Sequence, residues 1–189
     1  FAGDATGTYN ENSSTAPQGV YGESKLAGEK AVIAANDKHI ILRTAWVFGE
    51  HGNNFVKTML RLGANRDSLG IVADQYGGPT YAGDIALALL HIADHYAAGT
   101  PTPWGIYHYA GVPHTSWFGF AQQIFAEAEK AGVYAKAIPQ LNAITTADYP
   151  TPAKRPANSK LDCSKLTQAF GLAPSDWQTA LKNIRAYSA

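Results

Sequence analysis

A chain of 189 residues with 15 basic and 15 acidic side chains has no formal net charge. Nucleic acids and anionic membranes bind strongly basic surfaces, so this balance predicts neither as a partner. The single cysteine, Cys163, excludes an intramolecular disulfide and favours a reducing compartment, the cytoplasm. The sequence has no apolar run near the roughly 20 residues of a membrane span and no signal-peptide pattern at its start.

Hydrophobic periodicity, capping residues and turn residues predict the order of the elements. Residues 1–16, rich in Gly, Asn, Ser and Thr, are expected to form a loop. Helices are expected over about 17–35, 54–64, 82–98, 115–131, 162–171 and 175–187. Strands are expected over 39–48, 68–73, 105–110 and 134–138. The segments 74–80 and 141–159 are expected to be irregular loops.

Particular side chains support these boundaries. The expected N-cap residues are Asn53 or Asn54, Thr115 or Ser116, Asp162 and Ser175. The apolar run Ile40-Ile41-Leu42 fits a buried parallel strand. The helix over 82–98 is expected to bury one stripe, which consists of Ile85, Leu89, Ile92 and Tyr96.

The first helix carries a tyrosine and a lysine, Tyr21 and Lys25, at a spacing that places both on one face. A lysine ammonium near a phenol stabilises the phenolate, so Tyr21 is a candidate general acid. Gly19, Gly22 and Gly28 interrupt the helix and suggest that another backbone or a flat ligand approaches closely. The alternative interpretation is an exposed Tyr-Lys pair on a surface helix.

Five ordered blocks of sequence carry a resemblance to a known family. They are Tyr21-Gly-Glu-Ser-Lys-Leu-Ala-Gly-Glu29 after Pro17, Leu42-Arg-Thr-Ala-Trp-Val-Phe-Gly49, and residues 52–62, 74–80 and 149–159. Together they resemble the extended short-chain dehydrogenase/reductases and, within them, the dTDP-4-dehydrorhamnose reductases.

The resemblance implies an α/β fold that combines the edge of a doubly wound, Rossmann-like parallel sheet with a smaller α/β substrate domain. Residues 1–50, joined by 81–112, would belong to the dinucleotide-binding domain. Residues 51–80 and 113–189 would form the substrate domain. The Gly-rich turn that holds the cofactor pyrophosphate in this family has no counterpart here. We therefore expect the chain to be the C-terminal part of a longer protein.

The implied reaction is hydride transfer from NADPH or NADH to the C4 ketone of dTDP-4-dehydro-L-rhamnose. Tyr21 would protonate the nascent alkoxide, and Lys25 would bind the nicotinamide ribose, so both residues are catalytic and cofactor-binding. The family's third catalytic hydroxyl is expected outside these residues.

The resemblance also implies residues that bind the dTDP-sugar. Trp46 would line its pocket, and Asn53 or Asn54 would hydrogen-bond the sugar. Arg155, with Asn158 beside it, would close over the nucleotide, because a guanidinium suits a pyrophosphate. The weaker candidates for this pocket are Gln75 and Thr80.

Each assignment has an alternative. Trp46 could be a core tryptophan, Asn53 or Asn54 only a helix cap, and Arg155 one half of an ion pair within the fold. The alternative functions are a sugar-nucleotide epimerase or dehydratase and a non-catalytic regulatory subunit of the same superfamily. The six histidines form no dense cluster, so no metal site is expected.

Two expectations concern the chain by itself. Without a pyrophosphate cradle, residues 1–189 should bind no nicotinamide cofactor with useful affinity, which calorimetric titration with NADPH measures. Apolar surface around Ile40, Ile41 and Leu42 should be bare and favour self-association, for example as a homodimer.

Overall fold

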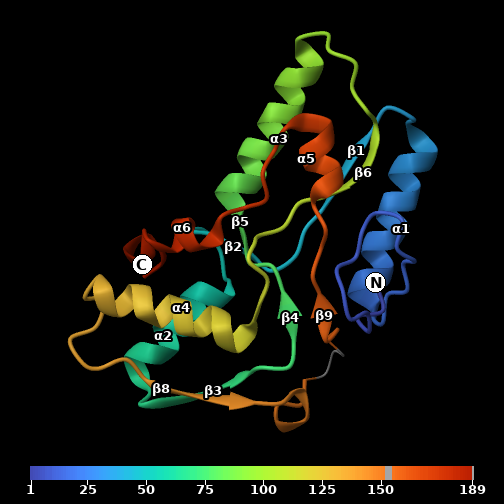
Figure 1. Cartoon of the computed structure of the whole chain (residues 1–189). Coiled ribbons are helices and arrows are strands. Elements are labelled where there is room, and N and C mark those ends of the chain that lie inside the picture. The colour runs from blue at the N-terminus through green and yellow to red at the C-terminus, as the bar shows by residue number, and fades with distance from the viewer. Residues whose placement is uncertain (152–154, 189) are drawn as a thin grey trace.

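The computed structural model describes residues 1–151 and 155–188. Helices and short strands alternate along the chain (Figure 1). The helices are α1 (Val20–Ala35), α2 (Phe55–Asn65), α3 (Ala82–Ala97), α4 (Trp117–Lys130), α5 (Ser164–Phe170) and α6 (Trp177–Leu181), with the 3-10 helices η1 (Thr146–Asp148) and η2 (Ile184–Tyr187). The strands are β1 (Ile40–Arg43), β2 (Val47–Phe48), β3 (Ser68–Val72), β4 (Tyr76–Gly77), β5 (Thr80–Tyr81), β6 (Gly105–His108), β7 (Thr115–Ser116), β8 (Gln140–Ile144) and β9 (Asn158–Ser159).

The strands pair mostly in parallel. β1 pairs with β6, β2 with β5, and β3 with β8, each in parallel. β4 lies between β7, which is antiparallel to it, and β9, which is parallel to it. Parallel neighbours need a crossover connection, and helices supply it here. The predicted α/β class is therefore confirmed.

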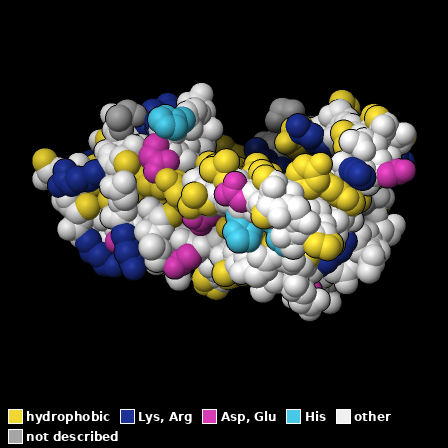
Figure 2. Space-filling view, turned by 90° about the horizontal axis from the view of Figure 1, so that it is seen from above, with side chains coloured by type: hydrophobic (Ala, Val, Ile, Leu, Met, Phe, Trp, Pro, Cys, Tyr) yellow, Lys and Arg dark blue, Asp and Glu magenta, His cyan; other side chains and the backbone are white. Residues whose placement is uncertain are grey.

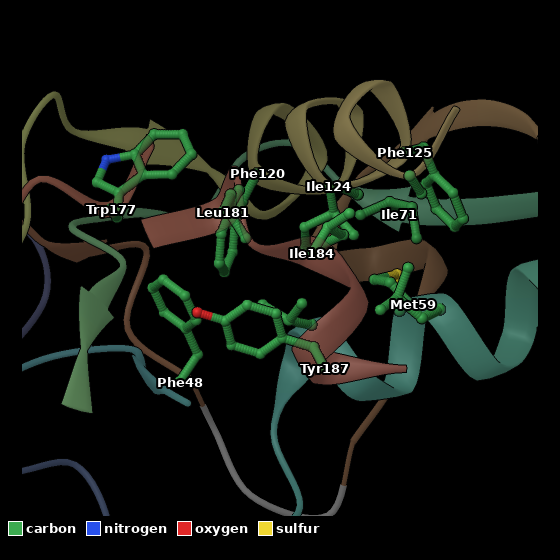
Figure 3. Packing of buried hydrophobic residues seen from close by; sticks show 14 of the residues in the cluster. Phe48, Met59, Ile71, Phe120, Ile124, Phe125, Trp177, Leu181, Ile184 and Tyr187 are labelled. Carbon is green, nitrogen blue, oxygen red and sulfur yellow. The ribbon is translucent and has the colours of Figure 1, made fainter. Parts of the chain in front are cut away.

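The largest hydrophobic core lies between α2, α4, α6, η2 and β3 (Figure 3). Its centre on α4 is formed by Phe120, Ile124 and Phe125, which are fully buried and recur at helical spacing. The Ser116 side chain caps α4 by accepting a 3.1 Å hydrogen bond from the Gly119 amide. The predicted helix is confirmed, and of its two candidate capping residues Ser116 is the cap.

A second core joins α3 and α5 to β6. Ala88 and Ile92 of α3 face Tyr107 of β6, and Leu166 and Phe170 of α5 complete the cluster. α5 thus packs on β6 although its residues fall within the predicted substrate domain. The predicted domain boundaries, 1–50 with 81–112 against 51–80 with 113–189, stay a prediction.

The expected strand over 39–48 is interrupted. β1 ends at Arg43, and β2 begins at Val47. Between them Trp46 adopts a φ of 49°, a left-handed conformation that a strand does not allow. Ile40 and Leu42 pack against the second core and Ile41 is half-buried, so 40–42 is not the bare patch that was expected; the self-association stays a prediction.

Exposed apolar side chains occur instead on the two long helices. α1 exposes Val20 and Val32, and α3 exposes Leu87 and Leu90 at 66% and 61%. Hydrophobic side chains are exposed at the surface across the middle of the face seen in Figure 2. The predicted stripe of α3 is wrong at Leu89 and Tyr96, which are 48% and 58% exposed, and the small Ala88 faces the core in place of Leu89.

The expected strand over 134–138 is also wrong. Tyr134 instead directs its hydroxyl to the Leu60 carbonyl at 2.8 Å, and the strand β8 begins six residues later, where Gln140 pairs with Ser68. The segments predicted to be irregular, 74–80 and 141–159, contain the short elements β4, β5, β8, η1 and β9.

Neither predicted C-terminal cap is found as expected. The N-cap of α5 is Cys163, whose side chain makes no capping bond, and the Asp162 carboxylate one residue earlier accepts a 2.9 Å hydrogen bond from the Ser164 amide. Ser175 does not cap α6, because the Asp176 carboxylate accepts the Thr179 amide instead. The buried Ser175 hydroxyl donates to Asp84 at 2.6 Å and so ties this segment to α3.

Candidate active site

Tyr21 and Lys25 lie one turn apart on the open face of α1. The Lys25 ammonium is 5.5 Å from the centroid of the Tyr21 ring, and Tyr21 is 77% exposed. The spacing therefore places both groups as predicted, side by side and accessible to a molecule that binds on this helix. A methyl group added at Gly19 or Gly28 would meet nothing within 4 Å among the described residues.

An ion pair ties α1 to β1. Arg43 donates to both carboxylate oxygens of Glu29, at 2.9 Å from Nε and 2.6 Å from Nη2. The two side chains are only 13% and 18% exposed. Because α1 has no buried residue among its 16, this bidentate pair is its principal anchor. It also sets the direction in which Tyr21 and Lys25 point.

Trp46 follows β1 and lies at the edge of the largest core. Its indole stacks on Trp117, with ring centroids 3.6 Å apart and an interplanar angle of 10°. Phe55 packs against Trp117 with ring centroids 4.6 Å apart. Trp46 is partly buried, so it contributes to the core and still presents part of its surface.

Thr80 holds the backbone around Trp46. Its amide donates to the Trp46 carbonyl at 3.1 Å, and its fully buried hydroxyl donates to the Ala45 carbonyl at 2.6 Å. A non-glycine residue in the left-handed region costs on the order of 1 kcal/mol or more, so such a turn persists only where neighbouring contacts fix it. Thr80, a weaker candidate for the pocket, thus has a supporting role.

The two asparagines of the 49–54 loop, Asn53 and Asn54, differ in their hydrogen bonds. The Asn54 side chain accepts from the Lys57 amide at 3.2 Å and donates to the Gly49 carbonyl at 2.7 Å. It is the N-cap of α2, and both its amide oxygen and its amide nitrogen already make hydrogen bonds within the fold. Asn53 is exposed beside it and keeps its amide available. Sugar binding by Asn53 or Asn54 stays a prediction, and the geometry favours Asn53.

Asn158 is buried and engaged with the N-terminal loop. Its amide nitrogen donates to the carbonyls of Ala5 and Gly7 at 2.6 and 2.7 Å, and its oxygen accepts from the Lys160 amide at 2.9 Å. These bonds use the side chain for structure. Its contact with a nucleotide stays a prediction.

Arg155 is exposed three residues before Asn158, next to residues 152–154, which lie outside the described part of the chain. Among the described residues its guanidinium makes no ion pair, so the alternative interpretation of Arg155 gains no support. Gln75, the other weaker candidate, is buried and donates to the Thr146 hydroxyl at 3.1 Å.

Strand β4 brings several predicted segments together. Tyr76 pairs with Asn158 on β9, and Gly77 lies against the Trp46 indole. Trp46, the Gly-Gly-Pro loop and the 155–159 segment therefore share one neighbourhood. No hydrogen bond or ring contact among the described residues joins this neighbourhood to Tyr21 and Lys25.

Two residues of this neighbourhood, Trp117 and Gly77, were not predicted from the sequence to belong to the site. Trp117 stacks on Trp46, and Gly77 leaves room for it. The signal for Trp117 was its position directly after the capping Ser116, which fixes its place at the start of α4. The signal for Gly77 was the Gly-Gly pair in a loop predicted to be ordered by its contacts.

His108 and His114 each have a ring nitrogen that is buried from solvent. His108 is fully buried, with Nδ1 3.1 Å from the Tyr9 carbonyl. The Nε2 atoms of His108 and His114 have no hydrogen-bond partner in the described structure. Burial lowers the pKa of both imidazoles below the usual value, against the opposing effects of the Glu11 carboxylate at His108 and of the Asp162 carboxylate at both.

This burial predicts a pH-dependent stability. Both histidines are neutral when folded and gain protons more readily when unfolded, so the free energy of unfolding should fall as pH drops below about 6.5. Urea unfolding at pH 7.5 and 5.5 measures it. His108→Gln should flatten the dependence, and His51→Gln, in an exposed loop, should not. Equal pH dependence in all three proteins would contradict the prediction.

Other kinds of site find little support in the described residues. Their His, Cys, Asp and Glu side chains form no cluster of three or more that could bind a metal ion. None of their helices is long and apolar enough to cross a membrane. A shallow groove of about 440 Å³ beside His114 is lined by neither Tyr21 nor Trp46. Cys163 is a free thiol, and burial raises its pKa to about 11.

The parallel strand pairs, the helical crossovers and the Tyr-Lys face define a Rossmann-like α/β protein of the short-chain dehydrogenase/reductase type. The family model of the RmlD substrate binding domain matches residues 1–188. The chain belongs to this family.

Relatives with known names agree with this family. The chain is 58% identical over 188 residues to a dTDP-4-dehydrorhamnose reductase from Aggregatibacter actinomycetemcomitans, covering 100% of this chain and 64% of that protein. It is similar to the crystal structure of such a reductase from Clostridium acetobutylicum, with a TM-score of 0.84, 36% identity and coverage of 98% of this chain and 61% of that one. The reductase from Bacillus anthracis, solved in complex with NADP, gives a TM-score of 0.85, 34% identity and the same coverage of 98% and 61%. The chain thus spans less than two thirds of the length of these relatives.

Proposed function

We propose that the complete protein containing this chain reduces the C4 ketone of dTDP-4-dehydro-L-rhamnose to dTDP-L-rhamnose. The observation that carries the proposal is the Tyr21–Lys25 pair, which lies one turn apart on the open face of α1. Membership of the RmlD substrate binding domain family and the names of the relatives supply the substrate class.

Tyr21 is the proposed proton donor. Its hydroxyl gives a proton to the O4 atom of the sugar as the carbonyl becomes an alkoxide, and the proton is later replaced from solvent. Lys25 stabilises the resulting phenolate, because its ammonium lies 5.5 Å from the ring centroid.

Lys25 has a second proposed role, in binding NADPH or NADH. The exposed ammonium can donate to a ribose hydroxyl of the nicotinamide nucleotide while Tyr21 faces the substrate. That cofactor, when bound, supplies the hydride that adds to C4. The relative from Bacillus anthracis was solved with NADP, which supports NADPH as the first cofactor to assay.

The neighbourhood of β4 is the proposed site for the dTDP-sugar. Trp46 presents a fixed aromatic surface to it, and Asn53 keeps a free amide beside α2. Arg155 can pair with the pyrophosphate through charge-assisted hydrogen bonds. Asn54 and Asn158 support this site through the backbone contacts that they make. We also propose that the complete protein is cytoplasmic, where sugar nucleotides and nicotinamide cofactors are both present. We propose that it forms a homodimer.

A turnover assay on the complete protein tests the proposal. With dTDP-4-dehydro-L-rhamnose as substrate, we expect one NADPH to be oxidised for each dTDP-L-rhamnose formed, with the product configuration read by NMR. An epimerised or dehydrated product without net loss of NADPH would overturn the proposal in favour of an epimerase or dehydratase. Binding of the sugar nucleotide without any product would favour a non-catalytic subunit.

A further inference from the structure

We propose that Gly77 and Trp117 are positioning residues that hold the Trp46 indole in one orientation and so set where the sugar nucleotide lies. The inference rests on the proposed function, in which Trp46 lines the substrate pocket. It adds two residues that contact Trp46 from different elements of the fold. Neither was predicted to belong to the site.

Trp46 needs such support because its backbone is in the left-handed region, at a φ of 49°. Bulky residues rarely adopt this conformation, and it persists where the surroundings determine it. The Thr80 amide and hydroxyl fix the main chain at Trp46 and Ala45. They leave the direction of the indole to its side-chain neighbours.

Trp117 supplies one such neighbour. Its ring is nearly parallel to the Trp46 indole, at 10° and 3.6 Å between centroids. Trp117 is itself held, because it opens α4 directly after the capping Ser116 and packs against Phe55. The stack is therefore anchored in the largest core, and a shift of Trp46 toward α4 is blocked.

Gly77 is the second neighbour that fixes the direction of the Trp46 indole. A methyl group at this position would lie 2.5 Å from Cε2, 2.8 Å from Nε1 and 2.9 Å from Cζ2 of Trp46. The Gly77 backbone cannot retreat freely, because it pairs with Thr115 on one side and Ser159 on the other. Any side chain larger than hydrogen must displace the indole.

The same strand links both contacts. β7, which pairs with Gly77, runs directly into the first residue of α4, Trp117. The spacing between Gly77 and Trp117 is thus set by a strand pair, and the indole is held between elements that this pair joins. Among the described residues the Trp46 Nε1–H has no hydrogen-bond partner, so the clamp also fixes a free donor near the proposed sugar site.

The test compares steady-state kinetics of the complete protein with those of Gly77→Ala, Trp117→Ala and Trp117→Phe. We expect Gly77→Ala to lower kcat/KM for dTDP-4-dehydro-L-rhamnose on the order of 100-fold, as a misplacement near 1 Å does, with an unchanged KM for NADPH. Trp117→Ala should act in the same direction, and Trp117→Phe should recover part of the loss because it keeps an aromatic ring. Near-ultraviolet circular dichroism should report the loss of the stacked indoles.

The matched control is Gly70→Ala on β3, where an added methyl group would make ordinary contacts of 3.4 Å with Ile144. If Gly77→Ala folds with the thermal stability of this control and keeps its kcat/KM, the positioning role is overturned. Should Gly77→Ala fail to fold, the two Trp117 variants decide by the same criterion.

Trp46→Ala separates this inference from the proposed function. An unchanged KM for the sugar nucleotide in Trp46→Ala would remove Trp46 from the substrate site and with it both proposals for this residue. A raised KM in Trp46→Ala, together with normal kinetics in Gly77→Ala and Trp117→Ala, would overturn the positioning role alone.

Discussion

Tyr21→Phe in the complete protein is expected to lower kcat for dTDP-4-dehydro-L-rhamnose by about 10²- to 10⁴-fold, roughly 3 to 5 kcal/mol of activation free energy. The substitution keeps the ring and removes only the hydroxyl that donates the proton. Tyr21 is 77% exposed and buries little surface in this chain, so its loss should leave the fold intact. Steady-state rates of NADPH oxidation, taken where a deuteride isotope effect shows that chemistry limits turnover, measure it.

Two variants accompany this prediction. Lys25→Met should weaken NADPH binding as well as turnover, because the lysine is proposed to serve both, whereas Tyr21→Phe should change cofactor affinity little. Tyr96→Phe on α3 is the matched control, since Tyr96 is 58% exposed and lies on a helix outside the proposed site. Near-normal turnover of Tyr21→Phe would return α1 to a structural role.

The features that local sequence predicted well are those that depend on neighbouring residues. The Tyr21–Lys25 face needs only a helix, and α1 forms within the predicted range. α4 begins after Ser116, because the capping hydroxyl and the helical spacing of Phe120 and Ile124 act within a few turns. The residues that determine such elements lie within the elements themselves.

The features that were missed depend on distant residues. The left-handed Trp46 is held by Thr80, which donates to the Trp46 and Ala45 carbonyls from another strand. The position of β8 is set by its pairing with β3, and the pattern around Tyr134 looked equally suitable for a strand. Local alternation indicates that a strand is possible, but the partner strand decides which residues form it.

The roles of polar residues in the candidate site were also hard to predict from the sequence. Asparagine suits a helix cap, a loop bridge and a sugar ligand equally, because all three use the same amide donors and acceptor. The structure assigns Asn54 to the cap of α2 and Asn158 to the N-terminal loop. A resemblance points to the right segments, yet only the hydrogen-bond partners show which amide remains free.

The ion pair between Glu29 and Arg43 gives the second large prediction, which concerns the attachment of α1. Glu29→Gln removes the charge and leaves Arg43 buried, with its Nη1 already lacking a hydrogen-bond partner among the described residues. Loss of one partner from a buried pair costs roughly 3 to 5 kcal/mol, and the exposures of 13% and 18% favour the lower end. Since α1 buries no residue and an isolated helix of its length is marginal in water, the helix should open while the rest stays folded.

Amide hydrogen exchange distinguishes this local opening from global unfolding. In Glu29→Gln the free energy of opening over Val20–Ala35 should fall by about 3 kcal/mol, while the amides of Trp117–Lys130 keep their protection. Glu23→Gln, an exposed carboxylate in the first turn of the same helix, should change it by less than about 1 kcal/mol. Unaltered exchange of α1 in Glu29→Gln would show that other contacts hold it. The expected release would instead mean that the direction of Tyr21 and Lys25, and with it proton transfer, depends on a carboxylate one turn beyond Lys25 on the same helix.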